Sequence, residues 1–313
     1  MNEAITYLRQ LLITRQGLLI TAEAYASAVM DVFPLTPVSQ IALPKKYSEI
    51  CQQALSVIQA EYPDFNITTD FSSNELADSS IAYHRVFGFI TSCSRYFFSS
   101  KQLETDLLAA EANPAISCHL FHVNSGGGEA WYLDRLSETI SSLKKPTVTL
   151  FEMAGGSAAY YIGCQAKYVF CLTDNDLIGC IGTMTDFYDW DSYFAKLGLK
   201  RITVRASKSD LKNKEHDDMC AGKPEEFIHK FLNPMNELFL QTVRRSRKKL
   251  KDVPEDEPVL RGETLMSQAA IEKGLVDGKN PCSKHCNMQK ILRQNGILKY
   301  QPGRKLSIFL ILN

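Results

Sequence analysis

Between about residue 80 and residue 278, short apolar runs alternate with segments of helical spacing, and this alternation constrains the fold more than any other feature of the chain. The apolar runs are typical of buried strands, and the amphipathic segments between them are typical of helices. Strand–helix–strand units at this spacing are right-handed crossovers, so the sequence predicts an α/β fold with a mostly parallel sheet. The expected strands are 81–91, 115–123, 146–153 and 167–172, and the expected helices are 101–113, 129–143 and 157–166.

The parts of the chain on either side of this repeating section have different patterns. Residues 1–78 are expected to form a helical and irregular extension, because apolar residues at helical spacing are interrupted there by prolines. Residues 79–278 hold the repeating strands and helices and are expected to form one domain. Residues 279–313 form a basic tail that contains Lys and Arg but no Asp or Glu.

Charge and cysteine content exclude several classes of protein. Lys and Arg together number 35, Asp and Glu together also number 35, and this balance argues against a dedicated nucleic-acid protein. The basic run Arg244–Lys251 follows a helical pattern and is expected at a helix C-terminus, where cations are favoured. The nine cysteines are an odd number scattered in mostly apolar contexts, which is typical of reduced thiols in a cytoplasmic protein.

No metal, cofactor or membrane span is expected from the sequence. Cys282, His285 and Cys286 make up half of a zinc-ligand pattern, and no second pair lies at ligand spacing. Residues 1–30 are interrupted by charged and polar side chains, so no apolar run there reaches the length of a signal peptide or a membrane helix. The protein is therefore expected in the cytoplasm.

Two junctions carry the candidate chemistry, because small residues stand where an apolar strand stops. At the first, Gly126, Gly127 and Gly128 either bring backbone N–H groups close to a ligand oxygen or simply make a tight turn. A phosphate loop is disfavoured there, since no Lys-Ser or Lys-Thr follows. At the second, Ser157 begins a helix among small residues, where it is either an N-cap or a nucleophile beside unpaired N–H groups.

Taken in order, these junctions and three later motifs resemble the signal peptide peptidase A family of serine peptidases. The family pattern has a Ser-Pro-Gly-Gly loop, an Ala-Ser-Gly-Gly-Tyr-Tyr-Ile-Ala turn, a Gly-Ser-Ile-Gly-Val segment, a lysine and a Gly-Leu-Val-Asp ending. The corresponding stretches of this chain are Ser125–Gly128, Gly156–Gly163, Gly179–Thr183, a lysine-rich stretch and Gly274–Asp277. The resemblance covers residues 80 to 278 and implies a ClpP/crotonase-type α/β fold with an N-terminal helical extension. The chain looks most like the soluble phage and prophage branch, whose members process capsid or scaffold proteins.

The resemblance implies a Ser–Lys dyad, in which Ser157 is the nucleophile and a neutral lysine is the base. Clp protease relatives need a histidine soon after the serine, and none of the six histidines lies between Ser157 and His216, so that variant is excluded. Lys212 is the first candidate for the base, because Ser209–Glu215 matches a Ser-x-x-Lys-Asn-x-Glu pattern of the phage-like branch. Lys208 is the second candidate, because anchored bacterial members have a shorter spacing and a Lys-Ser pair.

The oxyanion hole that the resemblance implies consists of N–H groups from Gly127 or Gly128 and from Ala158. The chain departs from the family pattern here, since Ala158 and Ala159 replace two glycines and Gly126 replaces the usual proline. An alanine N–H still donates to an oxyanion, and small residues leave space for a peptide carbonyl. The sequence therefore predicts a shallow site that prefers small or apolar side chains beside the cleaved bond.

Two other functions stay open at this point. A crotonase-type acyl-CoA enzyme would use paired N–H groups with an acidic base, and Glu129 and Glu152 lie near the two junctions. An inactive ring-forming scaffold would hold its serine and lysine out of reach of each other. For the peptidase, the expected partners are a protein or peptide substrate and further copies of this chain, with no nucleic acid. The apolar helix expected at 225–243 would pack between the copies of such a homo-oligomer.

Overall fold

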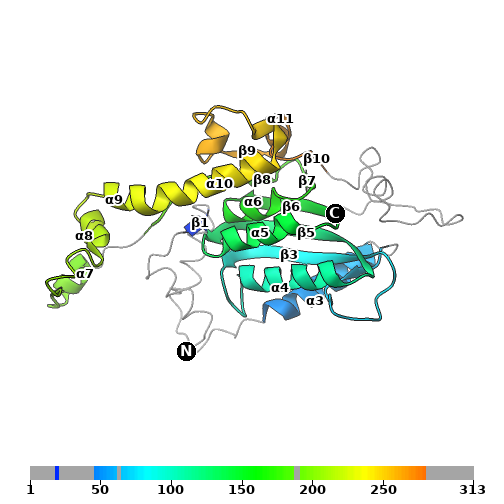
Figure 1. Cartoon of the computed structure of the whole chain (residues 1–313), viewed down its shortest axis with the longest axis horizontal. Coiled ribbons are helices and arrows are strands. Elements are labelled where there is room, and N and C mark those ends of the chain that lie inside the picture. Colours follow the sequence, from blue (N-terminus) through cyan, green and yellow to red (C-terminus); the bar gives the residue numbers. More distant parts are fainter. Residues whose placement is uncertain (1–17, 21–45, 62–64, 187–190, 280–313) are drawn as a thin grey trace, which may run out of the picture.

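The computed structural model describes residues 18–20, 46–61, 65–186 and 191–279, and its central feature is one mostly parallel β-sheet (Figure 1). Its strands are β1 (Leu18–Ile20), β2 (Ile67–Thr68), β3 (Ser80–Thr91), β4 (Phe98–Ser99), β5 (Ile116–Glu129), β6 (Thr147–Gly156), β7 (Tyr168–Cys171), β8 (Leu177–Gly179), β9 (Thr264–Met266) and β10 (Gly278–Lys279). The main path has the order β10-β7-β6-β5-β3-β2, and each pairing along it is parallel. β8 pairs in parallel with the end of β6, and β9 pairs antiparallel with β8.

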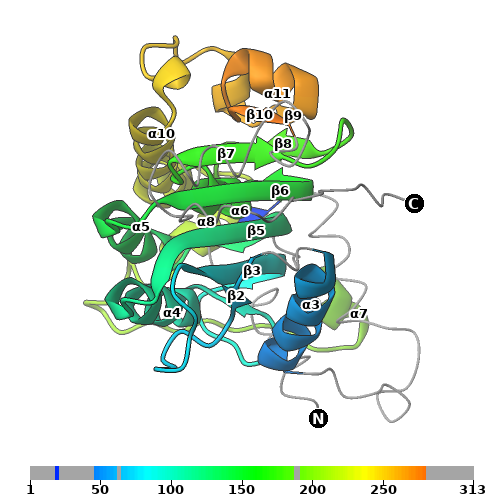
Figure 2. The ribbon, with the colours of Figure 1, turned by 90° about the vertical axis from the view of Figure 1, so that its right-hand side faces the viewer.

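Helices connect the parallel strands, and several of them cover the sheet (Figure 2). They are α3 (Tyr47–Glu61), α4 (Ser100–Ala112), α5 (Leu133–Ser142), α6 (Ala158–Gly163), α7 (Asp191–Lys196), α8 (Lys214–Cys220), α9 (Glu225–Phe227), a π-helical turn (Ile228–Leu232), α10 (Asn233–Ser246) and α11 (Ser267–Lys273). α4 leads into β5, α5 leads from β5 to β6, and α6 leads from β6 to β7. These crossovers bring the carboxyl ends of β5 and β6 together at one end of the sheet.

The hydrophobic core lies between the sheet and helices α4, α5 and α6. Along β5, Phe121 and Val123 are fully buried, whereas His122 and Asn124 are only partly buried, as the two-residue period of a strand requires. The same core contains Phe151 from β6 and Leu136 from α5. Burial of alternate strand residues against amphipathic helices therefore gives the sheet its helix-covered face.

The predicted α/β class with repeated strand–helix crossovers is confirmed. The predicted strands 81–91, 146–153 and 167–172 correspond to β3, β6 and β7. The predicted helices 101–113 and 129–143 correspond to α4 and α5, although α5 begins only at Leu133.

The late start of α5 reflects a difference at the glycine triplet. Gly126–Gly128 were predicted in a turn or loop after a strand ending at residue 123, whereas they lie inside β5, which continues to Glu129. A Cβ atom on Gly128 would lie 2.1 Å from the carbonyl oxygen of Ile90 on β3. The absence of a side chain at Gly128 therefore allows β5 and β3 to lie close together.

Two strands from the predicted N-terminal extension, residues 1–78, pair with the sheet. β1 pairs antiparallel with β5, and β2 pairs in parallel with β3. α3 agrees with the helical character predicted for this extension. Residues 1–17 and 21–45 of the extension lie outside the described residues, as does the tail from residue 280 onwards with Cys282, His285 and Cys286.

Three observations concern the described ranges as a whole. No helix in them combines the length and the apolar character that crossing a bilayer demands. None of their cysteines forms a disulfide, and Cys118, Cys164 and Cys171 are buried. No group of three or more His, Cys, Asp or Glu side chains in these ranges is arranged to hold a metal ion.

Residues 191–232 form an arm that projects from the body of the molecule, to the left in Figure 1. α7 and α8 lie at the outer end of this arm. α9, the π-helical turn and α10 follow one another without a break and return the chain to the core, where Phe239 and Val243 of α10 are buried. The apolar helix predicted at 225–243 thus both supports the arm and anchors it.

Candidate active site

Ser157 occupies the tight turn between β6 and α6. Its backbone has a φ of 54° and a ψ of −121°, a conformation that residues other than glycine rarely adopt. The residue is 1% exposed, and its side chain makes no capping bond to the helix that follows. The Ser157 side chain is therefore not the N-cap of α6, which was one of the two roles that the sequence left open.

Backbone hydrogen bonds hold this turn from both sides. The N–H of Ser157 donates to the carbonyl of Gly179 at 2.9 Å, and the carbonyl of Ser157 accepts the N–H of Tyr161 at 2.8 Å. Cys180, which follows the last residue of β8, donates its N–H to the carbonyl of Glu263 at 2.9 Å. Gly179, the first residue of the Gly179–Thr183 motif, therefore supports the serine turn through its carbonyl.

A buried carboxylate, Asp176, fixes the strand end just before the turn. Its Oδ1 accepts the N–H of Met153 at 2.9 Å, and its Oδ2 accepts the N–H groups of Leu172 and Thr173, each at 2.7 Å. Asp176 is 1% exposed, so these bonds replace the water that a buried carboxylate would otherwise lack. The sequence analysis did not identify Asp176, because nothing local to its stretch shows that three N–H groups converge on it.

Phe151 explains two glycines around the turn. A Cβ on Gly155 would lie 2.2 Å from the Phe151 ring, and a Cβ on Gly163 would lie 2.7 Å from the same ring. The ring stacks on Tyr160, with centroids 5.9 Å apart. Gly155 and Gly163 therefore make room for a core aromatic ring.

The short helix α6 is anchored by groups far away in the sequence. The hydroxyl of Tyr160 donates to the carbonyl of Leu275 at 3.0 Å, and burial raises the pKa of Tyr160 well above its usual value. Thr242 of α10 donates to the hydroxyl of Tyr161 at 3.2 Å. All six residues of α6 are buried, so the start of this helix has little freedom to move.

The Gly274–Asp277 motif provides part of this anchor. Leu275 and Val276 are buried in the core, and Asp277 pairs with Arg247 at 2.5 Å. Asp277 also accepts the N–H of Val169 at 2.8 Å. The basic run Arg244–Lys251 therefore uses its buried member, Arg247, to join the end of α10 to this motif, in addition to placing cations near the helix C-terminus.

The predicted oxyanion donors lie around the same strand ends. Ala158 is the first residue of α6, where the N–H has no acceptor within the helix. The register pairs Ser125 of β5 with Gly155 of β6, which brings the glycine triplet next to the turn. The N–H of Gly127 already donates to Oγ of Ser125 at 3.0 Å, so Ala158 is the better placed donor of these two.

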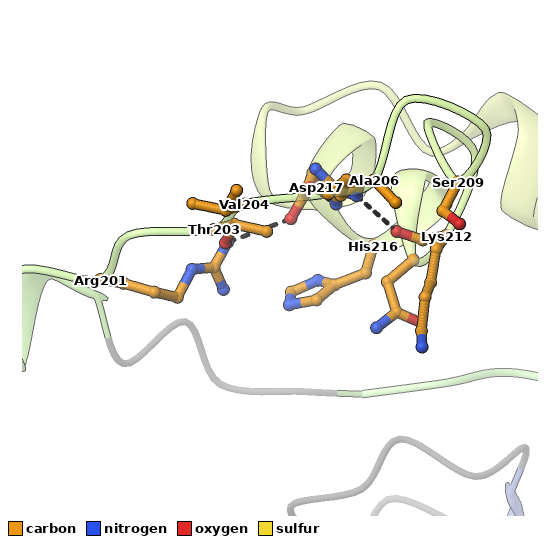
Figure 3. Close-up of a pocket in the computed structure, with 10 residues that line it drawn as sticks. Arg201, Thr203, Val204, Ala206, Ser209, Lys212, His216 and Asp217 are labelled. Atoms are coloured by element: carbon orange, nitrogen blue, oxygen red, sulfur yellow. Dashed lines mark hydrogen bonds and ion pairs between the residues drawn. The ribbon is translucent and has the colours of Figure 1, made fainter.

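The two candidate bases, Lys208 and Lys212, lie on the arm. Lys212 is exposed in the turn before α8 and lines a cavity of about 400 Å³ together with Ser209 and His216 (Figure 3). Lys208 is exposed in the same segment. The N–H of Lys212 donates to the carbonyl of Ser209 at 3.1 Å, which links the two residues of the predicted Ser-x-x-Lys pattern.

Two arginines organise the wall of this arm cavity around one carboxylate. The guanidinium of Arg201 donates to Asp217 at 3.0 Å, and Arg205 contacts the other oxygen of the same carboxylate. The hydrogen bond from Arg205 is the main cause that lowers the pKa of Asp217. Arg205 also donates from Nε to the carbonyl of Lys212 at 2.7 Å, so these charges hold the backbone on which Lys212 stands.

The structure brings Ser157, Ala158 and the glycine triplet to one end of the sheet, but it does not bring either lysine to them. Figure 1 shows α8 at the outer end of the arm, whereas α6 packs against the sheet. Lys212 and Lys208 therefore do not pair with Ser157 within this single chain.

The acidic residues that an acyl-CoA enzyme would need are engaged elsewhere. Oε2 of Glu152 lies 2.9 Å from Nε2 of His122, and this contact lowers the pKa of Glu152. Glu129 is buried and accepts the N–H of Ser92. His119, the other histidine of β5, lies 3.1 Å from Glu111 and is fully buried.

Comparison with protein families supports a peptidase. Residues 140–292 match the model of peptidase family S49. The matched stretch contains Ser157, Lys208, Lys212 and Gly274–Asp277, and it supports a hydrolase of peptide bonds at the level of this family. This agrees with the resemblance to the signal peptide peptidase A family. No curated protein matches the chain.

Solved structures similar to the chain include two from the enoyl-CoA hydratase family and one named ThnE. An enoyl-CoA hydratase from Shewanella pealeana is 13% identical over 63% of this chain and 62% of its own, with a TM-score of 0.34. A member of the enoyl-CoA hydratase/isomerase family is 13% identical over 65% of this chain and 67% of its own, with a TM-score of 0.35. ThnE from S. clavuligerus is 11% identical over 72% of this chain and 84% of its own, also with a TM-score of 0.35. This chain spans less than two thirds of the length of the first hydratase.

Proposed function

We propose that this chain is a serine endopeptidase in which Ser157 attacks the scissile carbonyl and Lys212 removes the proton from its hydroxyl. The observation that carries the proposal is the turn at Ser157, where a buried, uncapped hydroxyl stands on a positive-φ backbone at the start of a helix. The match to peptidase family S49 across this turn supports the same reaction class.

The chemistry needs a place for the negative charge that forms on the carbonyl oxygen. In the proposed reaction the N–H of Ala158 donates to this oxygen, with a second donor from the backbone at Gly127 or Gly128. The leaving amine takes the proton that the lysine removed, and water then hydrolyses the acyl-enzyme at Ser157. Lys212 must be neutral to act as a base, which requires that its amine be taken out of bulk water.

A second copy of the chain is the proposed source of that burial. Lys212 is exposed on an arm that holds it away from the serine of its own chain. The same arm exposes large apolar side chains, among them Ile202 at 76% and Val204 at 87%. Exposed apolar surface of this kind is typical of protein contacts, so we propose a homo-oligomer in which the arm of one copy brings Lys212 to Ser157 of the next.

The proposed substrate is a protein or peptide with small or apolar side chains beside the cleaved bond. Ala158 and Ala159 are fully buried at the turn, and Ala154 stands three residues before Ser157. Side chains this small leave shallow space without a charged pocket. The resemblance to the phage and prophage branch supports processing of a capsid or scaffold protein in the cytoplasm as the biological setting.

The test of this proposal is Ser157→Ala, with hydrolysis of a mixed peptide library followed by mass spectrometry. We expect all cleavage to disappear and the free energy of unfolding to change by less than about 1 kcal/mol, because the hydroxyl makes no capping bond. Wild-type cleavage should occur beside small or apolar residues. Full activity in the variant would disprove the nucleophile. An inactive wild-type protein that assembles normally would favour the scaffold.

A further inference from the structure

Near its end, β5 has β3 on one edge, and on the opposite edge it has first β6 and then β1. Gly127 and Gly128 pair with Phe89 and Ile90 of β3, so β3 occupies the first edge. On the opposite edge, β6 pairs with β5 as far as Ser125, opposite Gly155. β6 then ends at Gly156, and its chain turns away at Ser157. A bare edge would therefore start at this point, immediately beside the candidate nucleophile.

β1 covers this stretch of edge. Leu18, Leu19 and Ile20 pair antiparallel with Glu129, Gly128 and Gly127, respectively. Since β3 already pairs with Gly127 and Gly128, β1 must lie on the other edge, the one that β6 leaves. A segment distant in the sequence thus takes the position where an extended peptide would add to the sheet beside Ser157.

We infer that β1 is an internal competitor for peptide substrates, which holds the open edge of β5 until an external peptide displaces it. This inference rests on the proposed peptidase function and concerns the regulation of the same site. Its occupant is a named part of this chain, residues 18–20, and its chemistry is backbone pairing, which is available to any extended peptide.

The polarity of β1 also indicates how a substrate lies. β1 runs from the level of Glu129 to the level of Gly127, and hence towards Ser125. Ser125 pairs with Gly155, two residues before Ser157. A peptide bound with the polarity of β1 therefore places its N-terminal part along Gly127–Glu129 and directs the bond that follows towards the serine.

The short length of β1 makes displacement feasible. Only three residues pair with β5, so only a few backbone bonds must be exchanged for those of an incoming peptide. A tethered segment competes at an effective concentration in the millimolar range, which weakens an external peptide without excluding it. The expected consequence is a raised KM rather than a lowered turnover number.

Proline substitutions in β1 test this competition. Alternate residues of a strand donate their N–H groups to the same edge, so one of Leu19→Pro and Ile20→Pro must remove a bond to β5. Leu19→Val is the matched control, because a β-branched residue keeps the N–H and favours the strand. The probe is a fluorescein-labelled peptide with the sequence of residues 16–22, and binding is measured by fluorescence anisotropy in full-length protein carrying Ser157→Ala.

We expect at least one proline variant to bind the probe about ten-fold more tightly than the Leu19→Val control. Hydrogen exchange of the segment that contains Gly127–Glu129 should also become faster in that variant without the probe and slow again with it. If neither proline variant binds more tightly, or if exchange in this segment is unchanged in both, β1 is not a competitor.

The two proposals fail in different ways. The binding measurement uses a protein without the nucleophile, so its outcome does not depend on catalysis. Tighter binding in a proline variant, with no hydrolysis by the wild-type serine, would keep the competitor and reject the peptidase. Hydrolysis by wild type with identical KM values in the proline variants and Leu19→Val would keep the peptidase and reject the competitor.

Discussion

The turn at Ser157 and the arm that carries Lys212 differ in almost every physical respect. The turn is buried, and its backbone is bonded to Gly179 and Tyr161. The arm is mostly exposed, and its charges are organised around Asp217 by two arginines. The turn is held by contacts within one chain, whereas the arm has exposed apolar surface and holds Lys212 away from Ser157.

This difference teaches that the two halves of the proposed dyad depend on different levels of structure. Contacts within one chain hold the geometry of the proposed nucleophile: Phe151 and Tyr160 pack beside the turn, Asp176 bonds the strand end before it, and Gly179 and Tyr161 bond its backbone. The position of the base depends on what the arm docks against. Variants at the Ser157 turn should therefore change the free energy of unfolding. Variants on the arm should instead lose activity that a second copy of the chain can restore.

The largest expected effect is on catalysis by the arm. Lys212→Met should lower the turnover number by about 10²-fold to 10⁴-fold, because methionine keeps the stem but cannot accept a proton. Lys208→Met is the matched control on the same exposed segment and should retain activity. The measurement is peptide hydrolysis at saturating substrate, with the melting temperature unchanged in both variants. The reverse result would transfer the role to Lys208.

Mixing inactive copies sharpens this test. If the arm acts on a neighbouring copy, Ser157→Ala and Lys212→Met proteins that exchange subunits should together recover about a quarter of the wild-type activity. Each sample alone should remain inactive. If activity does not return after subunit exchange has been confirmed, the lysine works within its own chain. The arm would then have to move to bring Lys212 to Ser157.

The next effect is on the stability of the turn. Gly155→Ala should reduce the free energy of unfolding by about 1 to 3 kcal/mol, since its Cβ would lie 2.2 Å from the Phe151 ring. Gly278→Ala is the control, because its Cβ would make an ordinary contact at 3.7 Å with Phe170. Denaturant unfolding gives both values. Adding Phe151→Leu to Gly155→Ala should cost less than the sum of the single changes, and strict additivity would contradict the packing argument.

The smallest effect contrasts a carboxylate of the body with exposed charges. Glu104 of α4 is buried and accepts hydrogen bonds from Tyr132, Thr139 and Arg135, and the bond from Tyr132 is the main cause that lowers its pKa. Because the folded pKa is lowered, its stabilising contribution is present above the unfolded pKa of about 4.3 and disappears as pH falls through the folded value. Glu104→Gln should therefore cost about 1 kcal/mol at pH 7.

Melting temperatures measured from neutral to acid pH check this prediction. The difference between wild type and Glu104→Gln should shrink as the pH falls below 4. Glu138→Gln removes an exposed carboxylate 3.5 Å from Arg135 and should change little at any pH. A difference that stays constant with pH would mean that the charge of Glu104 does not contribute.

Much of the fold could be predicted from the sequence, because its main signals are local. The apolar runs at 81–91 and 146–153 became β3 and β6, since a short run of strand-forming residues buries well in a parallel sheet. Ser157 was chosen as a candidate nucleophile because of its small neighbours and its place at a strand end. The structure places it in a strained, buried turn.

The differences arise where distant segments meet. Gly126–Gly128 look like a turn in sequence, yet they lie in a strand, because β3 pairs with Gly127 and Gly128 on one edge and β1 pairs with the same two residues on the other. Asp176 has no local signal, since its bonding partners at Met153, Leu172 and Thr173 converge only after the strands have paired.

The sequence by itself determined the order of the strands and helices between residues 80 and 172, the mostly parallel class of the sheet and the place of Ser157 at the end of β6. Periodicity and turn chemistry act over a few residues, so they can be read along the chain. Only the tertiary structure decided that β1 lies on the edge beside Ser157 and that Lys212 stands on an arm away from it. These positions depend on which strand edges remain unpaired and on which surfaces the core leaves exposed, and such properties exist only once the whole sheet has formed.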